Sequence, residues 1–253
     1  MKIINFHEHV ADDLIERNKR LGISVSVLLS VGAEDEARGI RLSEEHPGSF
    51  IPFAWLGDLK DIPKDISRFE NLVKKGKVRG IKFQPLIQHF FPEEKHLYPI
   101  YELCQRLSLP ILFHCGIVTF YSEFGIPHIE RYGCPVFGID EIAYEFPELP
   151  IVIAHMGGNY HYEALAVAEK HSNIYLDTAY LAFFCTRFLP IIKPIELIKR
   201  AVEFVGPERV LFGWEGTDPS NILKSDLPQA VKKKILWHNA ATLLSIDDRD
   251  FVS

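Results

Sequence analysis

The stretch PIVIAHMGGNYHYEALAVAEKHSNIYL, residues 150–176, contains one complete strand–helix–strand unit. Its first five residues are all apolar, and a second apolar run closes the stretch at residues 173–176. Between these runs, residues 160–171 have the mixed apolar and polar spacing of an amphipathic helix. Continuously apolar strands joined through a helix are typical of parallel sheets that are covered on both faces.

The same unit recurs along the whole chain. Strands are predicted at residues 2–6, 23–31, 50–56, 78–83, 110–113, 150–154, 173–176 and 209–212. Amphipathic helices are predicted at residues 12–20, 34–46, 64–75, 97–107, 139–146, 160–171, 194–205 and 227–236. Eight strand–helix units in a chain of about 250 residues predict an α/β fold of the (β/α)8 TIM-barrel type.

A doubly wound open sheet is the alternative fold, but its glycine-rich dinucleotide-binding motif is absent after the first strand. The sequence contains no internal repeat, low-complexity tract or Pro/Ser-rich linker, so one domain covering residues 1–253 is expected. The connection at residues 115–138 is unusually long and rich in aromatic residues, glycine and proline. It is either a substrate loop or a surface excursion with its own small apolar cluster.

The composition limits the classes of partner. The chain has 253 residues, is 47% hydrophobic and 25% charged, and carries a formal net charge of −6. This acidic balance argues against a nucleic-acid or anionic-membrane surface, which needs a basic patch. No signal peptide is recognised and the apolar runs are far shorter than the roughly 20 residues of a membrane helix, so a cytoplasmic location is expected. The four cysteines lack Cys-x-x-Cys spacing, which predicts reduced and mostly buried thiols.

Four of the eleven histidines fall at the ends of predicted strands. His7 and His9 follow the first strand in NFHEHV, and alternate strand residues share a face, so the two rings can hold one metal ion. His114 ends the fifth strand in ILFHCG, and His155 ends the sixth in IVIAHMGG. In a barrel these histidines lie at the C-terminal rim, where barrel enzymes do their chemistry. We therefore predict a metal site there, with a hydrogen-bonded structural role as the alternative for each histidine taken alone.

A carboxylate ligand is expected from the eighth strand. The stretch VLFGWEGTDPS offers both Glu215 and Asp218. Glu215 directly continues the strand end, two residues after Gly213, whereas Asp218 lies three residues further on in a turn-like Gly-Thr-Asp-Pro. We favour Glu215, and a helix cap or a loop charge is the alternative role for either residue.

Several motifs together resemble one family. HxH follows the first strand, RGIKFQP covers the fourth, FHCG the fifth and FPELPIVIAHMGG the sixth. NIYLDT marks the seventh strand, RVLFG the eighth, and NAATLL comes near the end of the chain. In this order, and over essentially the whole chain, they resemble the amidohydrolase-2 family. These metal-dependent (β/α)8 hydrolases include aminocarboxymuconate-semialdehyde decarboxylase and the resorcylate decarboxylases.

The resemblance implies one divalent metal ion, usually Zn²⁺, and an acid/base residue beside it, which corresponds to His155. The metal ligands correspond to His7, His9, His114 and one of Glu215 or Asp218. The chain departs from the family pattern at the last motif. Members usually have Phe-Gly-Ser-Asp or Phe-Gly-Thr-Asp, whereas this chain has Phe-Gly-Trp-Glu followed by Gly-Thr-Asp. An ungapped match selects Glu215, and a slip of three residues selects Asp218.

Such a site supports two reactions. A metal-activated water, oriented by Glu215 and served by His155 as acid/base, would hydrolyse a small carboxylate-bearing amide, ester or lactone. The same residues would also support non-oxidative decarboxylation of an unsaturated or aromatic acid. Lys82 has the position and charge to bind a substrate carboxylate, and pairing with a neighbouring acid is its alternative role. A non-catalytic barrel that binds a small molecule is a third function to weigh, and a homodimer is left open.

Overall fold

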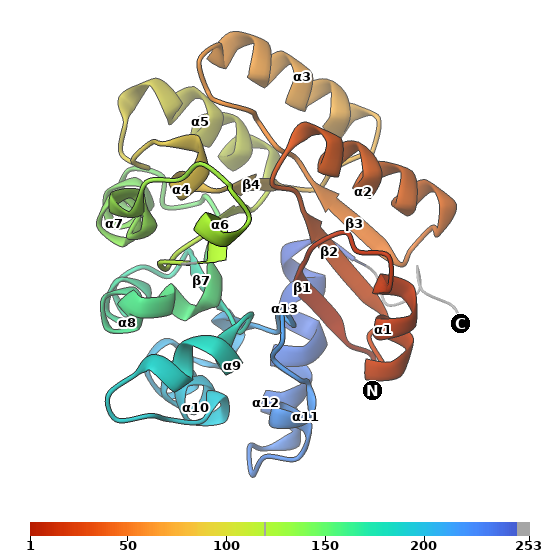
Figure 1. Ribbon diagram of the computed structural model, residues 1–253, viewed down its shortest axis with the longest axis vertical. Helices are drawn as coiled ribbons and strands as arrows, with labels where there is room; N and C mark the ends of the chain where they lie inside the picture. The colour runs from red at the N-terminus through yellow and green to blue at the C-terminus, as the bar shows by residue number, and fades with distance from the viewer. Residues whose placement is uncertain (119, 247–253) are drawn as a thin grey trace.

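The computed structural model describes residues 1–118 and 120–246, in which eight short strands alternate with helices (Figure 1). The strands are β1 (Ile4–Glu8), β2 (Val25–Leu29), β3 (Phe50–Phe53), β4 (Ile81–Phe83), β5 (Ile111–Phe113), β6 (Ile151–Ile153), β7 (Ile174–Asp177) and β8 (Val210–Leu211). Every pair of neighbouring strands is parallel. Each strand overlaps one of the eight that the sequence predicts.

The strands close into a barrel in chain order. Hydrogen-bonded neighbours run from β1 to β3 in one group and from β4 to β8 in the other. The groups meet where Ala54 bridges Ile81 and the backbone N–H of Lys82 donates to the Ala54 carbonyl at 3.0 Å. The second seam joins β1 to the end of β8, where the N–H of Phe6 donates to the carbonyl of Phe212 at 2.7 Å. The predicted (β/α)8 TIM barrel is confirmed.

Helices surround the strands, as Figure 1 shows. Those that overlap the predicted helices are α1 (Leu14–Leu21), α2 (Ala33–Glu45), α3 (Ile62–Lys74), α5 (Tyr98–Leu107), α7 (Val136–Glu145), α8 (His161–Lys170), α10 (Pro194–Val205) and α12 (Gln229–Lys233). The chain continues from α12 through the π-helical turn η6 (Lys234–His238) into α13 (Asn239–Leu243). The helix predicted at residues 227–236 is therefore a shorter α-helix followed by a wider turn.

Several short helices were not predicted. They are α4 (Pro85–Gln88), α6 (Phe120–Glu123), α9 (Leu181–Phe184) and α11 (Ser220–Leu223), with the 3-10 segments η1 (Lys95–Leu97), η2 (Glu130–Gly133), η3 (Ala154–Tyr160), η4 (Cys185–Arg187) and η5 (Pro207–Arg209). Most of them lie in the connections that leave the C-terminal ends of β4 to β8. In the long connection, Val118 and Tyr121 pack with Leu86 in a small apolar cluster apart from the main core.

A separate apolar core fills the barrel interior. It includes Phe6, Phe53, Leu112 and Leu211, which come from strands on different sides of the barrel and can meet only inside it. Trp237 joins this core, next to the start of β1, where Lys2 Nζ lies 5.2 Å from the Trp237 ring. The apolar filling therefore occupies the N-terminal end of the barrel, and the C-terminal rim is left for polar side chains.

The cysteines are all free thiols, and Cys104, Cys115 and Cys185 are buried, as the sequence predicts. Within residues 1–118 and 120–246, no helix has both the length and the apolar character that crossing a membrane requires.

Candidate metal centre at the barrel rim

The side chains predicted for the metal site come together at the C-terminal rim. β1, β5, β6 and β8 each deliver at least one of them, from the end of the strand or just beyond it. They line one small cavity, together with Lys82: His7, His9, His114, His155 and Glu215. The strand-end positions in the sequence thus correspond to one place in the fold.

His7 and His9 each hold one ring nitrogen against a fixed oxygen atom. Nδ1 of His7 lies 2.8 Å from Oδ2 of the buried Asp177. Nδ1 of His9 lies 2.7 Å from the backbone carbonyl of Leu29. Because these oxygens accept hydrogen bonds, Nδ1 carries the proton in both rings and Nε2 keeps its lone pair. Proteins present histidine to a metal ion in this arrangement.

Backbone carbonyls orient His114 and His155 in the same way. Nε2 of His114 lies 3.0 Å from the Gly116 carbonyl, and Nδ1 of His155 lies 3.0 Å from the Ala179 carbonyl. The other two nitrogens, Nδ1 of His114 and Nε2 of His155, therefore carry lone pairs and are 3.1 Å apart. Two lone pairs at this distance repel each other unless a proton or a cation is shared. The spacing therefore fits either a proton shared between the two rings or a cation next to them.

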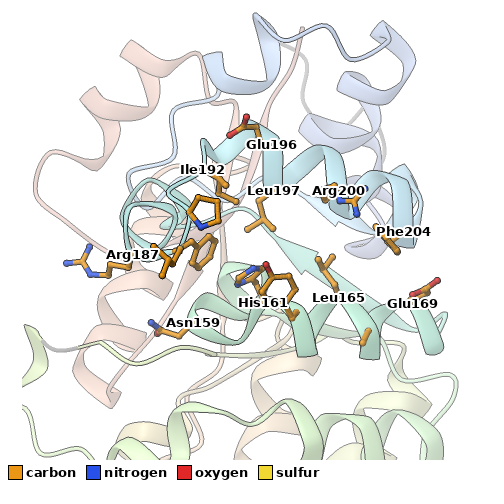
Figure 2. Close-up of a pocket in the computed structure, with 15 residues that line it drawn as sticks. Asn159, His161, Leu165, Glu169, Arg187, Ile192, Glu196, Leu197, Arg200 and Phe204 are labelled. Carbon is orange, nitrogen blue, oxygen red and sulfur yellow. The ribbon is translucent and has the colours of Figure 1, made fainter.

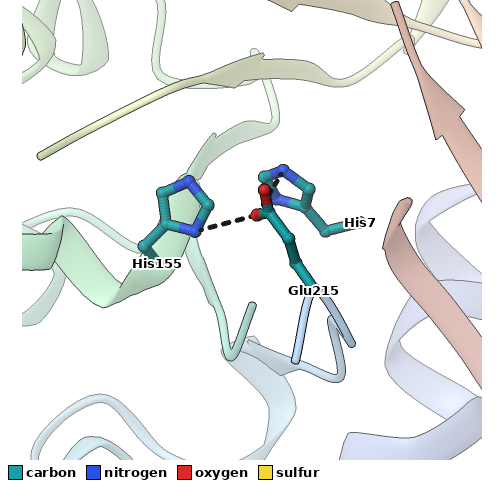
Figure 3. A group of neighbouring side chains, drawn as sticks. All are labelled: His7, His155 and Glu215. Atoms are coloured by element: carbon teal, nitrogen blue, oxygen red, sulfur yellow. Dashed lines mark ion pairs between the residues drawn. The ribbon is translucent and has the colours of Figure 1, made fainter. Parts of the chain in front are cut away.

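Glu215 brings a carboxylate to the same point (Figure 3). Its Oε2 lies 3.5 Å from His7 Nε2 and 3.6 Å from His155 Nδ1, and its Oε1 lies 3.8 Å from His9 Nε2. His7, His155 and Glu215 each offer a ligand atom within 4.8 Å of the others. Oε2 is buried and has no hydrogen-bond partner among the described residues. A buried carboxylate oxygen without a donor, in a carboxylate that faces the Nε2 lone pairs of His7 and His9, fits a cation.

The turn after β8 places Glu215 against the first strand. Glu215 has a φ of +23° and Gly216 a φ of +87°, so the chain reverses sharply. The N–H of Trp214 donates to Oδ1 of Asn5 at 2.8 Å. A Cβ at Gly213 would lie 2.9 Å from the Cβ of His7, so only glycine lets the turn come this close to β1.

Asp218, the other candidate carboxylate, lies outside this cluster. Its side chain is exposed, and Oδ1 accepts a hydrogen bond from the N–H of Ser220 at 2.7 Å, at the start of α11. This bonding to Ser220 lowers the pKa of Asp218. Asp218 therefore bonds within its own turn, and Glu215 is the acid that reaches the histidines.

The chain turns just as sharply at His155. Four consecutive residues have positive φ: +59° at His155, +49° at Met156, +89° at Gly157 and +57° at Gly158. Non-glycine residues in this region are strained and persist only where their surroundings hold them. Here the N–H of His155 donates to Oδ1 of buried Asp177 at 2.8 Å, which fixes the turn and aims the ring into the cavity.

Burial keeps the rim histidines neutral. It lowers the pKa of His7, His114 and His155 well below the usual value and that of His9 to about 4. The positive charge of Lys82 adds to each of these shifts. Neutral imidazole is the form that binds a metal ion.

Lys82 lies beside the cluster without a hydrogen bond. Its side chain is 1% exposed, and Nζ has no hydrogen-bond partner in the described part of the chain. Burial lowers the pKa of Lys82 and raises that of Glu215, and the attraction between the two charges opposes both shifts. The ammonium group is attracted to Glu215 and Asp177 but is hydrogen-bonded to neither.

The cavity itself is small, with a volume of about 10 Å³. That is room for about one water molecule or ion. Gln84, Val118, Tyr121 and Tyr180 complete its wall. The side chains of His9 and Glu215 are 33% and 24% exposed, so the cluster is open to solvent on their side.

Residues 29–246 match the family model described as amidohydrolase. The chain belongs to the amidohydrolase family. The match covers most of the barrel of this amidohydrolase but begins after β1, so His7 and His9 precede the matched residues. A comparison with curated proteins found no match.

Solved structures share the fold of this amidohydrolase. An uncharacterized TIM-barrel protein from Bordetella bronchiseptica aligns with a TM-score of 0.76 and 16% identity, over 97% of this chain and 99% of that one. A dihydroxybenzoic acid decarboxylase from Polaromonas sp. JS666, with bound manganese and the inhibitor 2-nitroresorcinol, aligns with a TM-score of 0.72 and 16% identity, over 96% and 89%. The 4-oxalomesaconate hydratase of Rhodopseudomonas palustris aligns with a TM-score of 0.70 and 20% identity, over 96% of both chains.

Family membership makes this amidohydrolase an enzyme of the hydrolase or lyase type. The third function that the sequence left open, a non-catalytic barrel that binds a small molecule, is therefore set aside. The residues at the rim fit a divalent ion on their own chemistry, because the neutral imidazoles of His7 and His9 turn Nε2 lone pairs toward a carboxylate whose buried oxygen has no donor.

Asp177 is the site residue that the sequence analysis missed in this amidohydrolase. It ends β7 in the motif NIYLDT and is completely buried. Besides binding His7, it accepts hydrogen bonds from the N–H of His155 at 2.8 Å and the N–H of Ala179 at 3.0 Å. The rule that selected the histidines, a polar residue directly at the end of an apolar strand, would also have selected Asp177.

A second and larger cavity of the amidohydrolase lies outside the barrel, between α8 and α10 (Figure 2). Its volume is about 750 Å³, and its lining is largely apolar, with Leu165, Phe188 and Phe204 among the residues. His161 lines it too, stacked on Phe188 with ring centroids 4.0 Å apart. We call this cavity the α8–α10 groove, and it contains none of the rim histidines.

Proposed function

We propose that the protein is a metal-dependent hydrolase of a small carboxylate-bearing amide, ester or lactone. One divalent ion, Zn²⁺, would be held by four side chains: His7, His9, His114 and Glu215. The observation that carries the proposal is that the Nε2 lone pairs of His7 and His9 face the Glu215 carboxylate at 3.5 and 3.8 Å, while its Oε2 has no hydrogen-bond partner among the described residues. Nitrogen ligands with one carboxylate suit zinc, and manganese, the ion bound in the Polaromonas protein, is the alternative.

When bound, the ion would polarise a substrate carbonyl and bring the pKa of water close to neutrality. The protein side chains supply the rest of the chemistry. Glu215 would orient the water. His155 would take the proton of that water on Nε2, whose lone pair is free because the Ala179 carbonyl keeps the other proton on Nδ1, and would pass it to the leaving group. Lys82 Nζ would bind the carboxylate of the substrate.

Non-oxidative decarboxylation of an unsaturated or aromatic acid is the second candidate. Its support is the named activity of the similar Polaromonas protein, together with the same side chains at the rim. In this reaction Lys82 would face the acid, and His155 would deliver a proton to the carbon atom that loses CO₂.

Metal analysis and product analysis test the two candidates. The purified protein is loaded with Zn²⁺ or Mn²⁺, dialysed, and its metal content is measured by mass spectrometry. We expect about one ion per chain and loss of activity after chelation. Release of an amine or an alcohol without CO₂ supports hydrolysis, and release of CO₂ supports the second candidate. A protein that retains no metal after loading contradicts both.

We also propose that the protein acts in the cytoplasm and that it forms a homodimer. Tyr162, Leu189 and Ile191 have exposed apolar side chains, a surface that a second copy would cover. Light scattering after size-exclusion chromatography measures the assembly directly.

A further inference from the structure

β4 brings two polar groups of a different kind to the rim. Lys82 and Gln84 are two residues apart on this strand and its end, so their side chains point to the same face, into the barrel mouth. Both line the cavity that contains the histidines, and each is 1% exposed. The histidines and Glu215 come from the other strands, so β4 faces the metal cluster across the cavity.

Each of the two side chains has a buried atom without a hydrogen-bond partner. These atoms are Nζ of Lys82 and Oε1 of Gln84, within the described part of the chain. A buried ammonium group and a buried amide oxygen both cost free energy when they are left unpaired. Native structures keep such groups where something else, commonly a ligand, supplies the missing partner.

Neighbouring segments hold Gln84 in place. Its Nε2 donates to the hydroxyl of Tyr121, and its backbone N–H donates to Oε1 of Gln88 at 2.8 Å. Gln88 is itself anchored, because its Nε2 donates to the carbonyl of Gly57 at 2.6 Å. The side-chain oxygen of Gln84 is therefore a fixed acceptor, and no rearrangement is needed before it can receive a hydrogen bond.

We propose that Lys82 and Gln84 form a substrate subsite that binds a carboxylate together with an N–H or O–H donor close to it. The proposal rests on the proposed function, since it places the reacting group of the substrate at the metal cluster. Lys82 Nζ donates to the carboxylate, and Gln84 Oε1 accepts from the donor. The subsite should thus bind acylamino acids and hydroxy acids more tightly than the same molecules with a methyl group in place of the donor hydrogen.

The selection follows from the burial of the acceptor. A ligand without the donor leaves Oε1 of Gln84 buried and unpaired, a loss of about tenfold in affinity for a neutral hydrogen bond. Access to the subsite is through its outer wall. Val118 belongs to a small apolar cluster of its own rather than to the main core, so it can move aside at lower cost than the strands while Tyr121 stays bonded to Gln84.

Matched ligands test the subsite on the full-length, metal-loaded protein. Calorimetry would compare N-acetylglycine with N-acetylsarcosine, and glycolate with methoxyacetate, because in each pair a methyl group replaces only the donor hydrogen. We expect the donor-bearing member of at least one pair to bind about tenfold more tightly. In Gln84→Met this preference should disappear. In Lys82→Met both members should weaken together.

Gln105 provides the matched control, because it lies in α5 and outside the cavity. Gln105→Met should keep the wild-type preference. Three results with the wild-type protein would overturn the subsite: equal binding of both members, tighter binding of the methylated member, or Kd values above about 10 mM for all four compounds. These results do not depend on whether a variant folds. Metal content measured on the same samples separates the two proposals. A protein that retains no metal contradicts the proposed function, whereas a metal-loaded protein without discrimination contradicts the subsite alone.

Discussion

The α8–α10 groove is much larger than the rim cavity, but the rim cavity has more polar groups without partners. The groove has a volume of about 750 Å³ and the rim cavity about 10 Å³. Yet two charged side chains of the groove already have partners: Glu196 accepts from the N–H of Lys193 at 2.6 Å, and Arg200 pairs with Glu203 at 2.6 Å. Three buried polar atoms of the rim cavity have none among the described residues.

This difference shows that volume is a poor guide to chemistry in this protein. A large apolar groove can bind a surface, but it has no group whose protonation is set for a reaction. At the rim, the Asp177 carboxylate and three backbone carbonyls each accept a hydrogen bond from one histidine ring and so fix its tautomer. Burial keeps the rings neutral. Substitutions at the rim should therefore change metal binding and turnover, and comparable substitutions in the groove should not.

The largest effect is expected on turnover for His155→Ala. The variant should keep most of its metal, because three other histidines and Glu215 remain, and it should lose about 10²–10⁴ in kcat as a positioned acid/base is removed. Metal analysis and turnover on the same samples check this. His161→Ala is the matched control in the groove and should change neither quantity. If His155→Ala loses its metal and His114→Ala keeps it, the roles of the two histidines are reversed.

His114→Ala should weaken the metal site itself. Its Nδ1 lone pair faces the cavity, so the substitution removes a proposed ligand rather than a supporting group. We expect metal affinity to fall by more than about 100-fold, beyond the usual effect of losing an outer partner. Competition with a chelator of known affinity measures this value, and retention of wild-type affinity would contradict the assignment.

Glu215→Gln and Asp218→Asn compare a rim acid with an exposed acid on the same loop. Glu215→Gln should lower metal affinity and turnover by about 10–100-fold, because the carboxylate charge that faces the imidazoles is lost. Asp218→Asn should leave both within twofold of the wild type, since it removes only the charge at a turn. The reverse order would show that Asp218 is the ligand.

Asp177→Asn tests the hydrogen bonds that orient His7 and His155. Its carboxylate binds Nδ1 of His7 and the N–H of His155, so an amide in its place loosens the orientation of both. We expect metal affinity to fall by about tenfold, less than for a direct ligand. An effect larger than that of His114→Ala would indicate that Asp177 itself binds the ion.

The smallest effect concerns the pH dependence of stability in the metal-free protein. Burial lowers the pKa of the rim histidines, so below about pH 6.5 the unfolded chain binds protons that the folded chain does not. This contribution to stability is complete above pH 6.5 and is lost as the pH falls towards about 4, the pKa of His9. Urea unfolding with chelator at pH 7, 5.5 and 4.5 measures it. His9→Gln should lose less stability over this range than the wild type.

The sequence predicted the barrel well because each strand is a continuous apolar run and each helix is amphipathic. Short helices such as α4 and α9 were missed, since four residues carry no periodic pattern and their shape depends on contacts at the rim. The rim histidines were found from their places at strand ends. Asp177 and Gln84 occupy equivalent places, and the same rule would have selected them had it been applied to acids and amides as well as to histidines.

The hydrogen bonds that orient the histidines could not be predicted. They end on backbone carbonyls of Leu29, Gly116 and Ala179, atoms that every residue has. Their positions depend on the register of neighbouring strands and on the turns that follow them. The sequence can therefore name the rings of the cluster, but only the folded chain decides which nitrogen of each ring faces the cavity.

The seam between β1 and β8 has a consequence for how the chain folds. It joins the first strand to the last through Phe6 and Phe212, and Glu215 meets His7 and His9 directly across it. These contacts have nearly the longest separation in sequence that the chain allows, so on a ribosome they form only after almost all of the protein has emerged. An ion bound by residues of both strands would stabilise the seam of the closed barrel. Metal uptake would then report the last step of folding as well as readiness for catalysis.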